Sequence, residues 1–130
     1  MIGDLLLGEG EFDEALKEFE SAAHDNPNDS FLHFRLATLY LRKGDLKKAL
    51  LEAEAARNLE PNNVENHLLL AGLYSSLGEN QKGLGEYNEV LKLDPKNQEA
   101  LLYLGALYLQ IEDYPRATRN LEELLKLEPN

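Results

Sequence analysis

The chain has 130 residues, a formal net charge of −11, and the proportions of hydrophobic (43%) and charged (28%) residues that are typical of a folded domain. Its 24 acidic side chains outnumber 13 basic ones and repel phosphate groups, so we expect no nucleic-acid partner. Because no apolar run approaches roughly 18 residues, we also expect no membrane insertion.

A repeat runs through the whole chain. Four of the five prolines, Pro27, Pro61, Pro95 and Pro129, are separated by one constant interval. An asparagine or aspartate follows each of them within two positions, which indicates a turn that can also cap the next helix. The prolines therefore predict the ends of four successive copies of one unit.

A glycine recurs at the same interval, at Gly10, Gly44 and Gly78, with Glu112 in the fourth copy. An acidic residue follows each of these four positions. A glycine that ends one helix and an acid that begins the next suit a left-handed C-cap and the dipole of a helix N-terminus. Each copy therefore predicts two helices joined by a tight turn.

The predicted elements are all helices, and no strand pattern competes with them. The pattern predicts helices, in chain order, near residues 1–8, 12–25, 30–43, 45–58, 64–77, 79–92, 98–111 and 113–126. We expect one all-α domain over residues 1–130. Its parts are a partial repeat at 1–29 and full repeats at 30–63, 64–97 and 98–130.

These columns resemble the tetratricopeptide repeat (TPR), a unit of about 34 residues with the motif Trp-x2-Leu-Gly-x2-Tyr, then Ala-x3-Phe, then Pro. Tryptophan is missing from every copy, and Glu112 replaces a glycine. The resemblance implies a right-handed superhelix of helix–turn–helix units, an α-solenoid. The second copy carries it with His33, Leu36, Ala37, Tyr40, Ala49, Ala53 and Pro61, and the third with His67, Leu70, Ala71, Tyr74, Gly83, Tyr87 and Pro95. The fourth copy has Leu101, Leu104, Gly105, Tyr108, Ala117, Leu121 and Pro129, and the first keeps Ile2, Gly3, Leu6, Ala15, Phe19 and Pro27.

Repeat arrays normally end in polar capping helices. The chain begins inside a predicted first helix and stops just after a repeat-ending proline, with no such cap visible. We therefore expect a fragment of a longer array, and association into homo-oligomers through its uncapped ends. The apolar candidates at the last repeat are Leu107, Ile111, Leu121, Leu125 and Leu127.

The sequence gives no support for catalysis, and we expect a protein that is not an enzyme and has no cofactor. Cysteine is absent, which excludes disulfides and thiolate chemistry. Neither Gly8-Glu9-Gly10 nor Gly83-Leu84-Gly85 follows a predicted strand, so neither is a dinucleotide fingerprint.

His33 and His67 occupy one slot in successive repeats and raise the question of a metal site. The same slot takes tryptophan in the TPR motif, which implies a packing role, and Leu101 fills it in the fourth copy. We therefore expect packing and no metal. The tyrosines at 40, 74 and 108 are likewise expected to pack in the core and not to form a stacking ladder for bases.

A second stripe runs along the predicted first helices beside the one used for packing. In the helix at 30–43 the packing stripe is Leu36, Ala37 and Tyr40, yet large apolar residues also lie outside it. First helices line the concave side of a stacked superhelix, so we expect the second stripe to line a peptide-binding groove. The predicted groove residues are Phe31, Phe34, Thr38, Leu41, Arg42, Glu65, Leu68, Gly72, Ser75, Glu99, Leu102, Ala106 and Leu109.

The predicted function is non-catalytic binding of an apolar or amphipathic peptide or helix of a partner protein. TPR domains that hold acidic chaperone tails carry lysines where Phe34, Leu68 and Leu102 stand, so the resemblance implies no such carboxylate clamp. One alternative is that some stripe residues only pack against neighbouring repeats. Others are a structural module that stacks end to end, or a regulatory domain of a larger enzyme or secretion component.

The predicted helix at 79–92 is the weakest of the array. Gly83 and Gly85 each cost ~1 kcal/mol relative to alanine in a helix. Asn80 stands where other copies have a bulky apolar residue. We expect this helix to open before its equivalents, and Gly83→Ala to stabilise it if the backbone there is helical.

Overall fold

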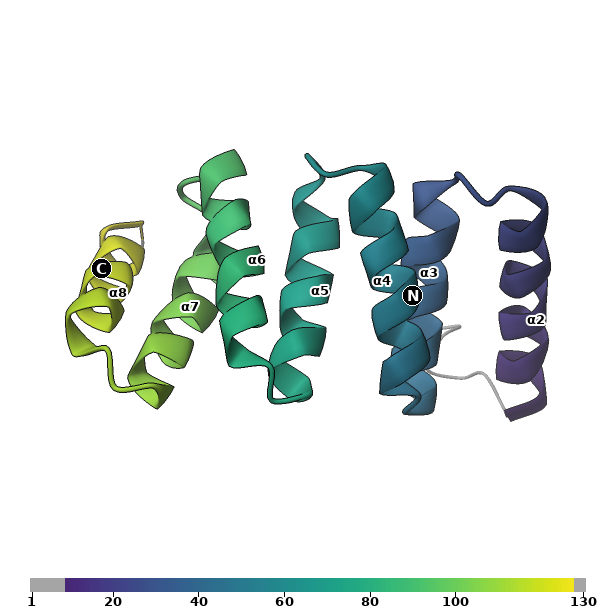
Figure 1. The fold of residues 1–130 in the computed structure, drawn as a ribbon, viewed down its shortest axis with the longest axis horizontal. Coiled ribbons are helices and arrows are strands. Elements are labelled where there is room, and N and C mark those ends of the chain that lie inside the picture. Colours follow the sequence, from purple (N-terminus) through teal and green to yellow (C-terminus); the bar gives the residue numbers. More distant parts are fainter. Residues whose placement is uncertain (1–8, 128–130) are drawn as a thin grey trace. The chain divides into compact units, whose positions relative to one another are not determined.

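The structure is a computed structural model that describes residues 9–127. Within that range every regular element is a helix, and none is a strand. The predicted helix at 1–8 lies outside the described residues. The helices, labelled as in Figure 1, are α2 (Glu9–Asp25), α3 (Ser30–Lys43), α4 (Leu46–Leu59), α5 (Val64–Ser76), α6 (Asn80–Leu93), α7 (Gln98–Gln110) and α8 (Tyr114–Leu127).

The other predicted helices are confirmed, α3 at its predicted bounds and the rest with small shifts at their ends. The helices belong to two compact units that meet in sequence at Glu60 and Pro61. In the first unit α3 packs against both α2 and α4. In the second unit α6 packs against α5 and α7, and α8 packs against α7. The partition into repeats at 29/30, 63/64 and 97/98 stays a prediction.

The turn between the two helices of a repeat has the same construction each time. Gly44 and Gly78 adopt left-handed backbone angles, with φ of 92° and 80°, and Glu112 adopts φ of 64° in the same column. The backbone N–H of the following acidic residue donates to the carbonyl of the tyrosine near the end of the first helix, as from Asp45 to Tyr40 at 2.9 Å. The predicted glycine C-cap is therefore confirmed at Gly44 and Gly78 and is wrong at Gly10, which lies inside α2. Glu112 holds the left-handed conformation at a steric cost that glycine avoids.

Side-chain caps begin most of the helices. The carboxylate of Asp45 accepts a hydrogen bond from the backbone N–H of Lys48, and that of Asp113 accepts one from Arg116. The proline turns supply the caps of first helices in the same way, through Asp29, Asn63 and Asn97. Among the helices α3 to α8, α6 differs, because Glu79 makes no side-chain cap hydrogen bond.

A cation lies over a tyrosine ring in each of the three repeats that follow α2. In each case the lysine or arginine stands in the first turn of the second helix, and its side chain reaches back over the tyrosine ring of the preceding first helix. Tyr40 and Tyr74 are buried, which confirms the predicted core role of these two rings. The pairs are Lys48 over Tyr40, Lys82 over Tyr74 and Arg116 over Tyr108.

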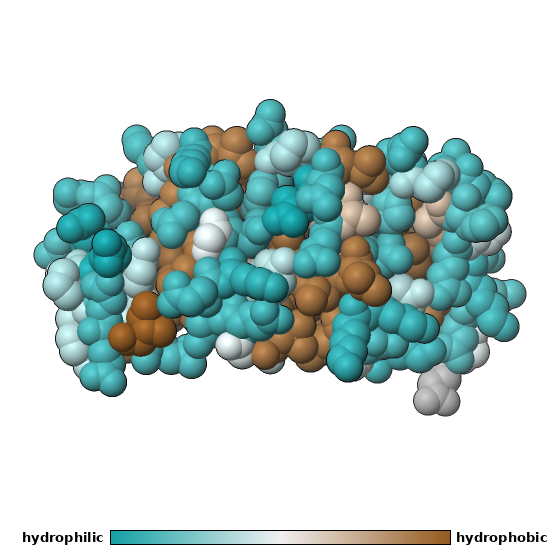
Figure 2. All heavy atoms as spheres, in the orientation of Figure 1, coloured by the Kyte–Doolittle hydropathy of each residue, from teal (hydrophilic) through white to brown (hydrophobic). Residues whose placement is uncertain are grey.

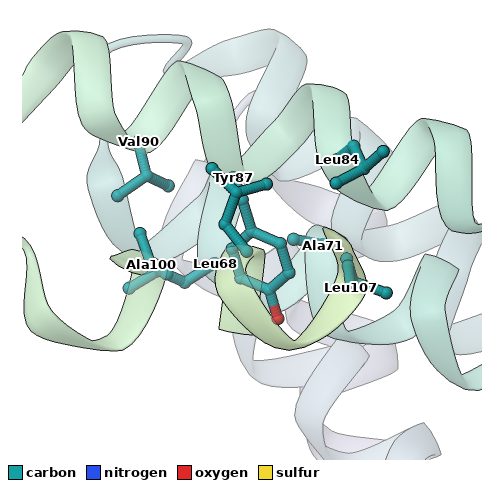
Figure 3. Packing of buried hydrophobic residues seen from close by; sticks show 8 residues of the cluster. Leu68, Ala71, Leu84, Tyr87, Val90, Ala100 and Leu107 are labelled. Carbon is teal, nitrogen blue, oxygen red and sulfur yellow. The ribbon is translucent and has the colours of Figure 1, made fainter. Parts of the chain in front are cut away.

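The core of the second unit lies where α5, α6 and α7 meet (Figure 3). Tyr87 of α6 projects among side chains of the two other helices. Small residues allow neighbouring helices to approach closely, as Gly105 of α7 does where α7 meets α8. A Cβ at this position would lie 2.9 Å from Leu121 Cδ2 of α8. The cluster comprises Leu68, Ala71, Leu84, Tyr87, Val90, Ala100, Leu104 and Leu107.

We predict that α6 opens before α4, because it lacks a side-chain cap and contains two glycines. Amide hydrogen exchange should be faster at residues 80–90 than at 46–56. Glu79→Asp should slow exchange in α6 and stabilise it by about 1 kcal/mol, since aspartate caps the same position at Asp45 and Asp113. Equal protection of the two helices would contradict this ranking.

The two glycines of α6 should respond differently to alanine. A Cβ at Gly85 meets nothing within 4 Å, whereas a Cβ at Gly83 would lie 2.8 Å from Ser75 Oγ and 3.4 Å from the Ala71 carbonyl. Gly85→Ala should therefore raise the free energy of unfolding by about 1 kcal/mol. Gly83 is helical, but the gain expected there from the sequence is opposed by this contact.

Chemical denaturation of the two single variants tests the difference. Gly83→Ala should gain less than Gly85→Ala, and Ser75→Ala should restore part of the gain when combined with Gly83→Ala. An equal gain for both single variants would show that Ser75 moves away freely.

Candidate functional site

In the first unit, α3 carries large apolar side chains outside its packing stripe. Leu36, Ala37 and Tyr40 of the packing stripe are buried. Phe31 is 63% exposed, and Leu41 is exposed as well. Phe34, between them on the helix, is half-buried. The helix therefore presents a short apolar surface that its packing does not use.

Thr38 and Arg42, the two polar residues of the predicted groove on α3, have local partners. The guanidinium of Arg42 lies 5.7 Å from the centroid of the Phe12 ring of α2, while the side chain remains exposed. The hydroxyl of Thr38 donates to the Arg35 carbonyl at 2.7 Å. These contacts leave Phe31, Phe34 and Leu41 as the part of α3 best suited to an apolar ligand.

A hollow lies beside Phe31, between the α2–α3 turn and the end of α4. Its lining includes the acidic residues Asp25, Asp29 and Glu60 and no basic residue. This hollow was not predicted from the sequence, although the proline turn that builds it was. The full lining is Asp25, Asn26, Pro27, Asn28, Asp29, Ser30, Phe31 and Glu60.

In the second unit, α5 offers less apolar surface than the sequence predicts. Leu68 is only 8% exposed and belongs to the core cluster with α6 and α7, so it is a packing residue and its placement in an open groove is corrected. Ser75 is half-buried, and its Oγ is buried without a hydrogen-bond partner. Gly72 is half-buried with open space at its Cβ position, and Glu65 is exposed.

The equivalent stripe on α7 is open. Leu102 and Leu109 are each 46% exposed, and Glu99 and Ala106 are exposed beside them. Leu102 stands in the same repeat column as Leu68. Leu68 of α5 packs against residues of α7, the first helix of the next repeat. Among residues 9–127 no first helix follows α7, so none covers Leu102.

Tyr103, which was not predicted as a surface residue, stacks on Tyr87 with ring centroids 6.0 Å apart and an interplanar angle of 21°. Tyr103 is exposed and Tyr87 is buried. Burial raises the pKa of Tyr87 to about 12, with the charge of Glu99 and the neighbouring Tyr103 adding to the effect. Tyr103 therefore adds an exposed aromatic ring to α7, held by the buried ring of Tyr87.

His33 and His67 bridge the two helices of their repeats. His33 Nδ1 lies 2.6 Å from Glu52 Oε1, and its Nε2 lies 2.7 Å from the Pro27 carbonyl. His67 has the same arrangement, at 2.6 Å from Glu86 Oε1 and 2.6 Å from the carbonyl of Pro61. The described residues contain no group of three or more histidine, cysteine or acidic side chains that is placed to hold a metal ion.

The surface is hydrophilic over much of the face drawn in Figure 2, with hydrophobic atoms showing in separate areas. None of the described helices combines the length and the apolar character that crossing a membrane requires. Of the predicted groove residues, exposed large apolar side chains lie on α3 and α7, which belong to different units.

Three profiles described as tetratricopeptide repeat match the chain, at residues 1–63, 64–97 and 86–119. The chain belongs to the tetratricopeptide repeat family. The resemblance seen in the sequence is thereby confirmed, as is the all-α helical-repeat solenoid. The comparison with curated proteins found no match.

Solved structures share the fold. A tetratricopeptide repeat protein from Parabacteroides merdae ATCC 43184 has a TM-score of 0.88 and 31% identity, over 94% of this chain and 49% of that one. The present chain therefore spans about half the length of that protein. A crystal structure of MamA has a TM-score of 0.86 and 20% identity, over 99% of this chain and 75% of that chain.

YrrB, described as a TPR protein with an unusual peptide-binding site, has a TM-score of 0.81 and 23% identity, over 92% of this chain and 61% of its own. At such identities, the likenesses to MamA and YrrB concern the fold alone. None of these comparisons places a ligand on this chain.

Proposed function

We propose that this TPR chain is a non-catalytic protein-interaction module that binds an apolar or amphipathic segment of a partner protein. The observation that carries the proposal is the apolar surface of α3, where Phe31 and Leu41 are exposed although the packing stripe of the helix is complete without them. Exposed apolar patches of this kind are typical of interaction sites. Leu102 and Leu109 of α7 form a separate surface in the second unit.

The charge around Phe31 favours a particular ligand. The hollow beside it is lined by the acidic residues Asp25, Asp29 and Glu60. Residues 10–30, which precede Phe31, hold seven acidic side chains and one lysine. Such a surface favours basic residues next to the apolar segment of the ligand, because complementary charge speeds association and fixes orientation. The unusual peptide-binding site of YrrB supports peptide recognition as a role for this fold.

Phe31→Ala should weaken binding about thirtyfold, since loss of an aromatic anchor costs ~2 kcal/mol or more and each 1.4 kcal/mol is about tenfold. Peptides selected from a random display library against the wild-type chain provide the ligand, and titration calorimetry measures the dissociation constant. Stability should change little, because Phe31 is mostly exposed.

Leu51→Ala is the matched control. Leu51 of α4 is 66% exposed, so its removal also deletes an exposed apolar side chain, but from a second helix. Binding by this variant should equal that of the wild type. If both variants bind alike, the surface of α3 is not the site and the proposal fails.

A second candidate, self-association, is favoured by the apolar surface at the last repeat. Leu125 is 71% exposed, and Ile111 and Tyr114 are exposed with it. Helices that present unpaired apolar faces can pair between copies of a chain. The proposal here is association through α8 into homo-oligomers.

Light scattering across a concentration series tests this candidate. The apparent mass of the wild-type chain should rise with concentration, and Leu125→Lys should suppress the rise. Phe31→Ala should leave it unchanged, which separates association through α8 from ligand binding on α3. A constant monomer mass at millimolar concentration would exclude association.

A further inference from the structure

The histidine bridges of this chain place hydrogen-bond acceptors at both nitrogens of each ring. A histidine bridge consists of one histidine, one glutamate and one proline. His33, Glu52 and Pro27 form the first bridge, and His67, Glu86 and Pro61 form the second. In each bridge Nδ1 faces a carboxylate oxygen at 2.6 Å and Nε2 faces a backbone carbonyl at 2.6 or 2.7 Å. A proline carbonyl can only accept, as can an ionised carboxylate.

The number of ring protons follows from these partners. A neutral imidazole has one N–H, so it can serve only one of the two acceptors, whereas an imidazolium has two. The distances of 2.6 to 2.7 Å are typical of hydrogen bonds in which a partner is charged. His67 is also buried, and Glu86 beside it is buried too. A buried carboxylate is stabilised by a positive partner.

We propose that the first bridge holds His33 as an imidazolium, so that a bound proton stabilises the packing of α3 on α4. Each bridge joins the proline turn before a first helix to the middle of the second helix of the same repeat. The first bridge lies on α3 and α4, and the second on α5 and α6. Release of the proton from His33 to solvent at alkaline pH then weakens the packing of α3 on α4.

The charged groups around the first bridge favour the imidazolium. Burial of the His33 ring lowers its pKa, but the hydrogen bonds to Glu52 and to the Pro27 carbonyl and the charges of Glu52 and Asp29 raise it, and the net shift of the pKa is upward. Glu52 lies on α4, and Asp29 is the N-cap of α3.

Acidic groups also face the second bridge. Glu86 contacts the His67 ring directly, and Glu89 follows it on α6. The pKa of Glu89 is lowered, mainly by its hydrogen bond to Lys92, with a smaller contribution from the charge of His67. The surroundings of both rings are therefore acidic, as an imidazolium requires.

The last repeat shows the same joint without a titratable pair. Leu101 stands in the histidine column and Asn120 in the glutamate column, one repeat after His67 and Glu86. Leu101 is buried, and the Nδ2 atom of Asn120 is buried without a partner. Both members of the pair are replaced together, so α7 packs on α8 with no bound proton at this joint.

The direction of the pH dependence follows from proton counting. An unfolded histidine loses its proton near about pH 6.5. Above that pH, and until the folded ring titrates, the folded chain binds more protons than the unfolded chain. The first bridge should then increase the unfolding equilibrium constant about tenfold per pH unit. The stabilisation is complete below the unfolded pKa and is lost as pH rises through the folded pKa.

Nitrogen NMR of the histidine rings tests the proton count directly. At about pH 7.5, above the ordinary histidine pKa, both nitrogens of His33 should carry protons. The exposed His24 supplies a comparison within the same sample. A neutral tautomer of His33 at that pH would overturn the proposal.

The variant His33→Leu with Glu52→Asn copies the pair already present at Leu101 and Asn120. Denaturation at several pH values should show that this variant loses the rise of about tenfold per pH unit in the unfolding constant. Glu89→Gln is the control, because it removes a carboxylate from α6, in the other unit, and leaves the first bridge intact; its slope should match the wild type. Equal slopes for the copied pair and the wild type would contradict the proposal.

The reverse change keeps the proposal testable if the variant with the copied pair in α3 and α4 does not fold. Leu101→His with Asn120→Glu should install a third bridge beside the Pro95 turn. The new ring should carry two protons at about pH 7.5, like His33. A neutral ring at position 101 would show that the pair alone does not bind the proton, and would count against the proposal.

Discussion

The close approach of helices at small residues is the constraint on which the rest of the structure depends. Ala37, Ala49 and Ala53 are fully buried in the first unit, and Ala71 and Ala117 are fully buried in the second. A larger side chain at any of these seams would separate the helices. The carboxylate and carbonyl beside His33 and His67 come within range because the seams are closed. The same holds for the cations over Tyr40, Tyr74 and Tyr108.

The helices and turns were predictable because they depend on local chemistry that recurs in every repeat. Proline, an aspartate or asparagine cap and a glycine C-cap each act over one turn of the chain, so α3 agrees with its predicted bounds. The candidate site was predicted less well. The exposure of a side chain depends on whether a neighbouring helix packs over it. The sequence does not show that Leu68 is covered in this way while Leu102 of the same repeat column is exposed.

The partners of the histidines were also missed, for a different reason. Glu52 and Glu86 lie on the second helix of the repeat, far along the chain from their histidines, where acidic residues are usually solvated. The signal was nevertheless present in the columns. Histidine and glutamate occur together in two repeats, and both are absent from the last, where Leu101 and Asn120 stand. Pairs of columns that change together carry information that single columns do not.

The repeats therefore separate two kinds of residue. The seam column of Ala37, Ala71 and Gly105 holds only small residues because every helix pair must close, and it reveals the fold but no function. Positions outside the seams differ from copy to copy: Phe31 is followed one repeat later by Glu65 and then by Glu99. A ligand that recognised only the fold would meet equivalent surfaces on each first helix. Since this column holds an aromatic ring on α3 and a carboxylate on α5 and α7, recognition through Phe31 and the acidic hollow beside it should be specific to α3.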